Sequence, residues 1–263
     1  MDLIKRVVVA VVFTPGIIAV FWLGGIWLQA FLFIIILISA WELRTLFRQK
    51  DIGIPWFIVP LTGMFFLVVT MSAWREVFLI AFAVFALVLG HDIILDRRNN
   101  ALMRVAASMF SLIYPGVFLA SLYHIRLLEN GRWLIPLLML SIWSTDTAAY
   151  FIGKNFGKHN GIIKVSPKKT IEGFVAGFVF AFALPFLMAW LKPEWISWSQ
   201  GVFIGVAVGV FGQIGDLLES MLKRDAGVKD SSQILPGHGG ILDRFDSLMG
   251  SAPVLLLLLL YFG

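Results

Sequence analysis

The chain has 263 residues, of which 59% are hydrophobic and 14% are charged; its net charge is +5 and it contains no cysteine. Soluble domains carry about 25% charged residues, so this composition excludes a soluble globular protein and indicates an integral membrane protein. The lack of cysteine in the sequence excludes disulfides and thiolate metal sites. The positive charge calls for no nucleic acid partner, because membrane topology and anionic lipid headgroups account for it.

Apolar runs of membrane-spanning length recur along the whole chain. A helix needs about 20 apolar residues to cross about 30 Å of hydrocarbon, and none of these runs alternates as a membrane β-strand would. We therefore expect an all-α, polytopic membrane protein of about nine helices. In chain order the predicted spans are 7–24, 26–47, 54–72, 76–93, 104–124, 133–152, 170–191, 200–219 and 243–262.

The basic residues sort by loop, which predicts the topology. With the N-terminus in the cytoplasm, 17 of the 21 Lys and Arg fall on the cytoplasmic side and 4 outside, as the positive-inside rule requires. The C-terminus is then outside. We expect one structural unit, in which residues 1–132 form about five spans and residues 133–263 form the catalytic region. The absence of a long soluble N-terminal extension favours a multi-pass protein of the bacterial inner (plasma) membrane.

Two predicted cytoplasmic loops, 153–169 and 220–242, concentrate the polar residues of the second half. Each ionisable group at membrane depth costs about 2.5–3.5 kcal/mol on insertion scales, so such groups are functional candidates. The alternative for any single one is a hydrated helix end or a structural ion pair. The carboxylates that flank the two loops are Asp146, Glu172, Asp216, Glu219, Asp243 and Asp246.

The spacing of these residues groups them on helix faces. Asp243 and Asp246 are three residues apart, so they share one face. Carboxylate oxygens suit Mg²⁺, which takes one or two carboxylates and completes its shell with water and substrate phosphate. A second face, spaced i, i+3, i+4 and i+7, carries Asp216, Glu219, Ser220 and Lys223.

Basic pairs and a glycine-rich turn indicate phosphate binding. Lys168–Lys169 and Lys223–Arg224 supply positive charge, and Arg can grip two phosphate oxygens. The turn 236–240 precedes a predicted helix, where backbone N–H groups and the helix N-terminus favour an anion. We place His238 of this turn in the site as a hydrogen-bonding residue and not as a proton-transfer catalyst.

The run from Ser220 to Asp246, SMLKRDAGVKDSSQILPGHGGILDRFD, resembles the signature of the phosphatidate cytidylyltransferases, also called CDP-diacylglycerol synthases. Two further blocks resemble the same family: Ser166–Gly173, with the sequence SPKKTIEG, and Asp146–Tyr150, with the sequence DTAAY. The likeness in motifs extends from Asp146 to the C-terminus. Over the first half it is limited to hydropathy.

The resemblance implies that CTP and phosphatidic acid are converted to CDP-diacylglycerol and pyrophosphate at the cytoplasmic face, with Mg²⁺, in phospholipid biosynthesis. It also favours a homodimer embedded among membrane lipids, and a second, monovalent cation is left open. By resemblance, the metal ligands are Asp216 and Asp243, followed by Asp246 and Asp146. The implied phosphate-binding and catalytic groups are Lys168, Lys169, Lys223, Arg224 and Arg244, with hydrogen bonds from Ser166 and Ser220. The remaining predicted substrate-binding residues are Glu172, Lys229, Asp230, His238, Gly239 and Gly240.

Two other functions compete with this one. A CTP-dependent lipid kinase of the dolichol-kinase type would transfer the γ-phosphate and release CDP. A transporter would use buried carboxylates to carry ions, but it would be expected to show repeated halves with broken helices at matching positions. Here the polar residues gather in the C-terminal half.

Overall fold

The computed structural model describes residues 15–263 except 73, 162–163, 236 and 238, and the described part contains no named β-strand. A helical stretch at 15–23 precedes the first labelled helix. The labelled helices are α2 (Gly25–Arg48), α3 (Ile58–Met71), α4 (Trp74–Ile94), α5 (Ala101–Leu127), α6 (Gly131–Phe156), α7 (Ile171–Leu191), α8 (Trp198–Val206), the π-helix η1 (Ala207–Gly212), α9 (Gln213–Asp225) and α10 (Leu242–Phe262).

The predicted all-α membrane class is confirmed. Seven helices in the described part of the chain are long and apolar enough to cross a membrane, with α8, η1 and α9 counted as one continuous rod. The helix α3 has 14 residues, fewer than the roughly 20 that a full crossing needs. Most of the predicted span 7–24 lies outside the described residues, so the count of nine and the sides of the two termini stay predictions.

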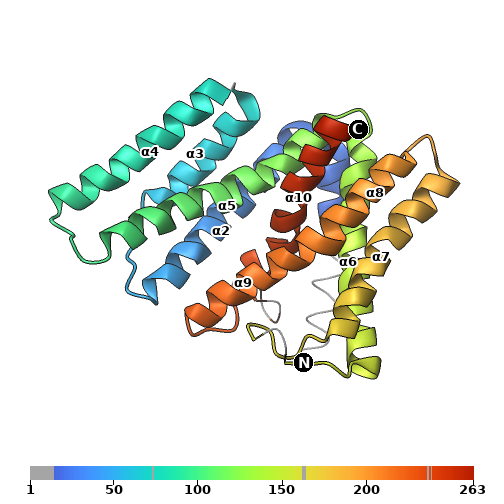
Figure 1. Cartoon of the computed structure of the whole chain (residues 1–263). Coiled ribbons are helices and arrows are strands. Elements are labelled where there is room, and N and C mark those ends of the chain that lie inside the picture. The colour runs from blue at the N-terminus through green and yellow to red at the C-terminus, as the bar shows by residue number, and fades with distance from the viewer. Residues whose placement is uncertain (1–14, 73, 162–163, 236, 238) are drawn as a thin grey trace.

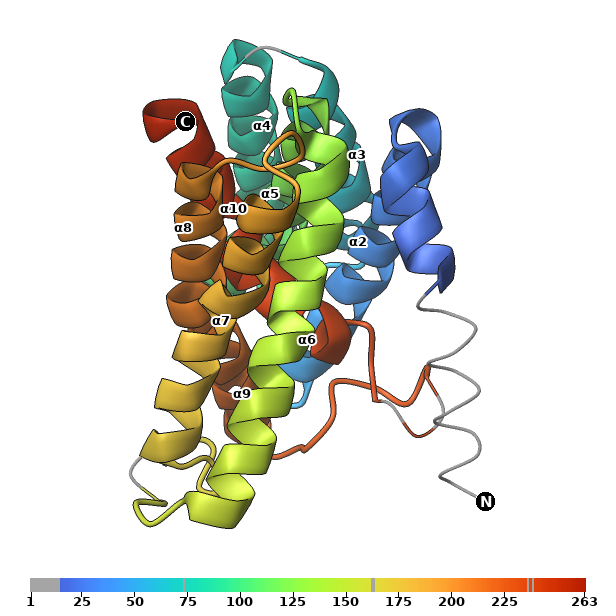
Figure 2. The same cartoon turned by 90° about the vertical axis from the view of Figure 1, so that its right-hand side faces the viewer.

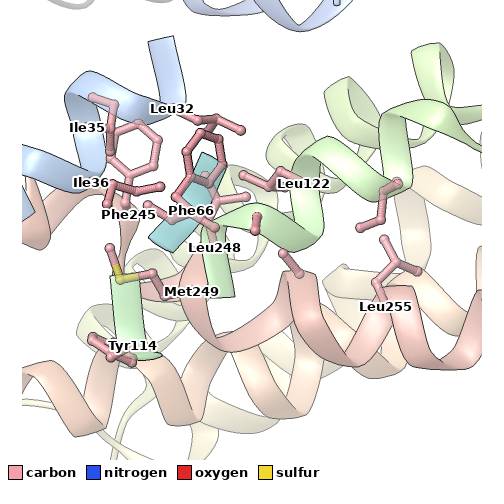
Figure 3. Packing of buried hydrophobic residues seen from close by; sticks show 14 of the residues in the cluster. Leu32, Ile35, Ile36, Phe66, Tyr114, Leu122, Phe245, Leu248, Met249 and Leu255 are labelled. Carbon is pink, nitrogen blue, oxygen red and sulfur yellow. The ribbon is translucent and has the colours of Figure 1, made fainter. Parts of the chain in front are cut away.

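Helix α10 lies at the centre of the bundle, where it contacts α2, α5, α6, α8, η1 and α9 (Figure 1). Much of the apolar core fills the space between α10 and the helices α2, α3 and α5. Figure 3 shows this packing, with Ile36 from α2, Phe66 from α3, Leu122 from α5 and Met249 from α10. All four side chains are fully buried. The start of α10, which carries two of the predicted site aspartates, therefore rests on helices of the first half.

The contact between α7 and α8 depends on glycines spaced four residues apart. A Cβ on Gly205 would collide with the ring of Phe182, one on Gly209 would lie 3.0 Å from Phe178, and one on Gly201 would lie 3.3 Å from Phe186. Small residues let membrane helices approach closely. This glycine row therefore serves the close packing of α8 and η1 against α7.

The two ends of the bundle differ in character. At the end that carries the α7–α8 connection and the C-terminus (Figure 2), Trp133 stacks on Trp195 with ring centroids 3.8 Å apart, and Trp22 contacts Trp133 edge-on at 4.5 Å. The opposite end carries the connections 157–170 and 226–241. The second of these was predicted to begin at 220. The helix α9 instead continues to Asp225, because its charged side chains pair along the helix and need no apolar surroundings.

Candidate functional site

The predicted site residues come from four elements that meet at one end of the bundle. Helix α6 carries Asp146, the connection 157–170 carries Lys169, α9 carries Asp216 to Arg224, and α10 begins with Asp243 and Asp246. One ion pair joins the connection 157–170 to α9, and another joins α9 to α10. The structure therefore brings both predicted loops and their flanking carboxylates to a common region.

A π-helix sets the orientation of α9. The widened turn η1 spans Ala207–Gly212, directly before α9, and such turns occur often at functional sites. The Gln213 side chain donates one hydrogen bond to the Gly209 carbonyl at 2.6 Å and another to the Phe174 carbonyl of α7 at 3.3 Å. These bonds fix the widened turn against α7 and so set the direction in which Asp216, one turn further on, projects.

Asp216 accepts a hydrogen bond from the ammonium of Lys169, and the two form an ion pair. Both side chains are about one-third exposed. The pair joins the connection 157–170 to α9. Thr170 then caps α7, with its hydroxyl oxygen accepting a hydrogen bond from Gly173 N at 3.0 Å, as N-cap threonines do.

Lys223 lies between two buried carboxylates. Its ammonium donates to Asp243 Oδ1 at 2.5 Å and forms an i,i+4 ion pair with Glu219. The side chains of Glu219, Asp243 and Lys223 are 1%, 7% and 12% exposed. Glu219 Oε1 has no hydrogen-bond partner among the described residues, so Lys223 is the group that compensates this acid.

Asp243, which follows the connection 226–241 in the chain, holds that connection by hydrogen bonds. Its Oδ2 atom accepts three hydrogen bonds, from Ser231 N at 3.0 Å, Ser231 Oγ at 2.8 Å and Gly240 N at 2.7 Å. Gly239 has φ +78°, and a Cβ there would lie 2.8 Å from the same oxygen, so the turn requires glycine. The Gly240 N–H predicted to face a phosphate thus donates to Asp243.

Glu42 of α2 holds the same connection from the first half of the chain. It is fully buried and accepts hydrogen bonds from Ser232 Oγ at 2.5 Å, Ser231 Oγ at 3.1 Å, Ile241 N at 3.0 Å and Leu242 N at 2.7 Å. The two N–H groups belong to the start of α10, where free backbone donors and the helix dipole favour a negative charge.

Asp146, Asp216 and Asp246 form a group of acids that interact electrostatically with one another. The positive charges of Lys169 and Arg244 attract the Asp146 carboxylate, and the positive charge of Lys223 attracts the Asp246 carboxylate. Within the described part of the chain, no three Asp, Glu or His side chains converge tightly enough to bind one metal ion together. Direct ligation of a metal would therefore come from one or two of these carboxylates.

Several residues predicted to bind phosphate or substrate lie at the surface. Lys168, Arg224, Lys229, Asp230 and Arg244 are exposed, and Arg224 donates to the Val228 carbonyl at 3.1 Å. Ser166 and Ser220 are half-buried. His238 lies outside the described residues. Lys169 is paired with Asp216, and Lys223 with Glu219 and Asp243.

Comparison with known proteins identifies the family. The family model described as the cytidylyltransferase family matches residues 4–262. The chain belongs to the cytidylyltransferase family. A protein from Staphylococcus saprophyticus named phosphatidate cytidylyltransferase is 35% identical over 260 residues, which cover 98% of this chain and 97% of the relative.

Two further relatives carry the same name. The Staphylococcus aureus protein is 35% identical over 263 residues, with 98% and 97% of the two chains covered. The Staphylococcus epidermidis protein is 36% identical over 241 residues, with 90% and 91% covered. The match to the cytidylyltransferase family therefore includes the first half, where the sequence motifs alone indicate no likeness beyond hydropathy.

Two residues near the predicted acids come from that first half and are missing from the sequence predictions. Glu42 is one, and Tyr114 of α5 is the other: its hydroxyl is buried without a hydrogen-bond partner among the described residues, in the field of Asp216, Glu219 and Asp246. Glu42 is the only carboxylate in the predicted span 26–47, and an acid inside an apolar span is the signal that could have identified it. No comparable signal marks Tyr114, since a tyrosine in an apolar helix is usual.

Glu172, predicted to bind substrate, is paired with His159 in the structure. Its carboxylate accepts from His159 N at 3.3 Å, and Oε1 lies 2.6 Å from His159 Nδ1. Thr170 provides the cap. Glu172 therefore joins His159, near the start of the connection 157–170, to the first turn of α7. Its contact with substrate stays a prediction.

Proposed function

We propose that this chain is a phosphatidate cytidylyltransferase, which joins the cytidylyl group of CTP to phosphatidic acid and yields CDP-diacylglycerol and pyrophosphate. The observation that carries the proposal is the near-full-length similarity to relatives of that name at 35% identity. The site agrees with it, because carboxylates and exposed cations gather at one end of a membrane-spanning bundle.

The reaction is an in-line displacement at phosphorus. An oxygen of the phosphatidate phosphate forms a bond to the α-phosphorus of CTP, the bond from that phosphorus to the β-phosphate bridging oxygen breaks, and pyrophosphate leaves with the electron pair. Such a transfer depends on positioning and on charge neutralisation more than on proton transfer. A site made of cations, carboxylates and backbone donors suits this need.

The exposed cations are the groups proposed to bind the phosphates. Lys168, Arg224, Lys229 and Arg244 lie at the surface of this end of the bundle. Arg can bind two phosphate oxygens at once, whereas Lys acts as a point charge. Lys169 and Lys223 are paired with Asp216 and Asp243, so their first role is to hold the two connections in register with α9.

An apolar recess beside the polar groups suits a lipid substrate. A cavity of about 330 Å³ is lined by Leu37, Ile38 and Trp41 of α2 and by Ile234 of the connection 226–241. Ile234 lies two residues from Ser232, which Glu42 holds. A lipid whose phosphate reaches the site could place part of an acyl chain in this recess.

Magnesium fits the donor set of the acidic group. Asp146, Asp216 and Asp246 offer oxygen atoms alone, which is the ligand type that Mg²⁺ prefers, and one or two carboxylates with water and substrate phosphate complete its shell. We assign Asp216 and Asp246 as the first candidates, because Asp243 Oδ2 already accepts three hydrogen bonds. A bound Mg²⁺ would neutralise charge on the nucleotide phosphates and on the pyrophosphate as it leaves.

The proposed location is the plasma membrane, with the site on the cytoplasmic side. The support is the distribution of Lys and Arg in the sequence, since the predicted topology puts 17 of the 21 on the cytoplasmic side together with both site loops. Accessibility of single cysteines placed at Lys168 and at Lys192, probed from each side of sealed vesicles, tests this orientation. The homodimer and a monovalent cation stay predictions, to be checked by light scattering of the detergent-solubilised protein and by salt substitution.

The deciding experiment uses purified protein in detergent with phosphatidic acid, Mg²⁺ and CTP labelled in the cytosine ring. We expect ring label in the organic phase and equimolar pyrophosphate in the aqueous phase. Transfer of γ-phosphate label without ring label would identify a lipid kinase and refute the proposal. Failure of both labels to move would also refute it.

The metal assignment is tested separately by Mn²⁺ binding, followed by electron paramagnetic resonance. We expect Asp216→Asn and Asp246→Asn to weaken binding, with Glu76→Gln, an exposed acid on α4, as the matched control. Unchanged Mn²⁺ binding in both aspartate variants would remove them from the metal site.

A further inference from the structure

Glu42 is a buried acid whose compensation comes from hydrogen bonds alone. Glu42 is fully buried, and no ion pair joins it to a Lys, Arg or His in the part of the chain that the structure describes. Two of its four partners are backbone N–H groups, which can only donate. A buried carboxylate is costly unless such donors satisfy it, so the arrangement is stable only while the connection 226–241 and the start of α10 stay where they are.

Both oxygens of Glu42 are used, and each takes one hydroxyl and one backbone donor. Oε1 accepts from Ser232 Oγ and Ile241 N, and Oε2 accepts from Ser231 Oγ and Leu242 N. The side chain therefore joins both ends of the connection 226–241 to α2. A shorter acid would not reach both ends, and an amide would turn its NH₂ group toward one of the two N–H donors.

The Ser231 hydroxyl connects Glu42 to Asp243. It has a single proton to donate and lies 3.1 Å from Glu42 Oε2 and 2.8 Å from Asp243 Oδ2, so the two acids share this one donor. Asp243 in turn holds Lys223. Close packing enforces the arrangement, since a Cβ on Gly240 would collide with both Ser231 Oγ and Glu42 Oε1.

We infer that Glu42 is a positioning residue for the transfer reaction: from α2 it fixes the start of α10 and the connection 226–241, and thereby the placement of Asp243 and Asp246. It is fully buried and acts through the groups that it holds. The inference rests on the proposed function. A misplacement of about 1 Å at a reacting group can cost about 100-fold in rate, and this is the size of effect expected from losing Glu42.

The test compares Glu42→Gln with the matched exposed change Glu76→Gln in the purified protein, by turnover, KM for CTP and phosphatidate, and thermal unfolding. We expect Glu42→Gln to lower kcat about 100-fold and to change KM by a smaller factor, because Lys168 and Arg224 lie on elements that Glu42 does not contact, whereas Lys229 and Arg244 lie on those that it holds. Glu76→Gln should match the wild type. A folded Glu42→Gln protein with kcat near that of the wild type would overturn the inference.

Removing single donors provides a second measurement that does not depend on the folding of Glu42→Gln. Ser232→Ala deletes one hydrogen bond to the acid and should lower kcat on the order of 10-fold in a folded protein. Unchanged kcat in Ser232→Ala, when Glu42→Gln fails to fold, would show a purely structural role and refute the inference. A wild-type protein that forms no CDP-lipid would instead refute the proposed function, so the two failures are distinct.

Coupling between positions is the readout that a merely structural role would not produce. If Glu42 acts through Ser231, the kcat losses of Glu42→Gln and Ser231→Ala should overlap, so that the double variant loses far less than the product of the two single losses. Independent, fully multiplicative losses would refute the proposed path from Glu42 to Asp243.

Discussion

Replacing Lys223 with methionine removes the ammonium that lies between Glu219 and Asp243 while keeping the length of the side chain. Glu219 is 1% exposed and one of its oxygens has no hydrogen-bond partner among the described residues, so the variant leaves an uncompensated buried carboxylate. Breaking a buried ion pair in this way costs about 3–5 kcal/mol of unfolding free energy. Asp243 suffers less, because three further hydrogen bonds remain on its Oδ2 atom.

The chain contains a matched control for this change. Lys50 pairs with Asp225 at 3.0 Å, but these side chains are 42% and 66% exposed, and exposed pairs contribute about 0–1 kcal/mol. Lys50→Met should therefore have little effect. Adding Glu219→Gln to Lys223→Met removes the uncompensated charge and should recover most of the loss.

The assay is an SDS titration of the detergent-solubilised protein, followed by tryptophan fluorescence, for Lys223→Met, Lys50→Met and the double variant. A loss in Lys223→Met no larger than that in Lys50→Met would show that the buried network contributes nothing to stability. A double variant less stable than Lys223→Met would show that Glu219 is not the residue left uncompensated.

Three more variants test other contacts. Gly205→Leu should lower the unfolding free energy by about 1–3 kcal/mol, because the new side chain meets Phe182; adding Phe182→Ala should restore part of that loss. A Gly205→Leu protein as stable as the wild type would contradict the close approach of α7 and α8. Tyr114→Phe should leave the thermal midpoint unchanged or raise it, because the buried hydroxyl has no hydrogen-bond partner among the described residues; a lower midpoint would reveal a partner that the described residues do not supply. Asp243→Asn should lower CDP-lipid formation more than 100-fold in a protein that still elutes as a single species, because an amide cannot accept from Lys223 and from three further donors; normal turnover would remove Asp243 from the mechanism.

The positions of most helices could be predicted from sequence because a crossing helix is almost entirely apolar. The span predicted at 170–191 is α7, Ile171–Leu191, and the one at 243–262 is α10, Leu242–Phe262. Hydropathy could not locate the end of α9, since its last turns are stabilised by ion pairs. It also could not reveal η1, because a widened turn has the same composition as the α-helix around it.

The site was predictable where motif and chemistry coincide, and less so where packing decides. The acids and bases of the C-terminal half were identified, and contacts join Lys169 with Asp216 and Lys223 with Asp243. The partners of these residues could not be predicted, because spacing along a helix shows which residues share a face and not which residue of another element lies opposite. Glu42 was missed because its donors lie about 190–200 positions away in the chain.

That separation has a consequence for how the protein is made. At about 5–20 residues per second, the 189 positions between Glu42 and Ser231 put roughly 10–40 s between the insertion of α2 and the arrival of the hydroxyls that satisfy its acid. Glu42 lies six residues before the end of α2, about 9 Å along the helix axis. The acid is thus synthesised well before its hydrogen-bond donors, and the docking of the connection 226–241 onto α2 is a late step in the assembly of the bundle.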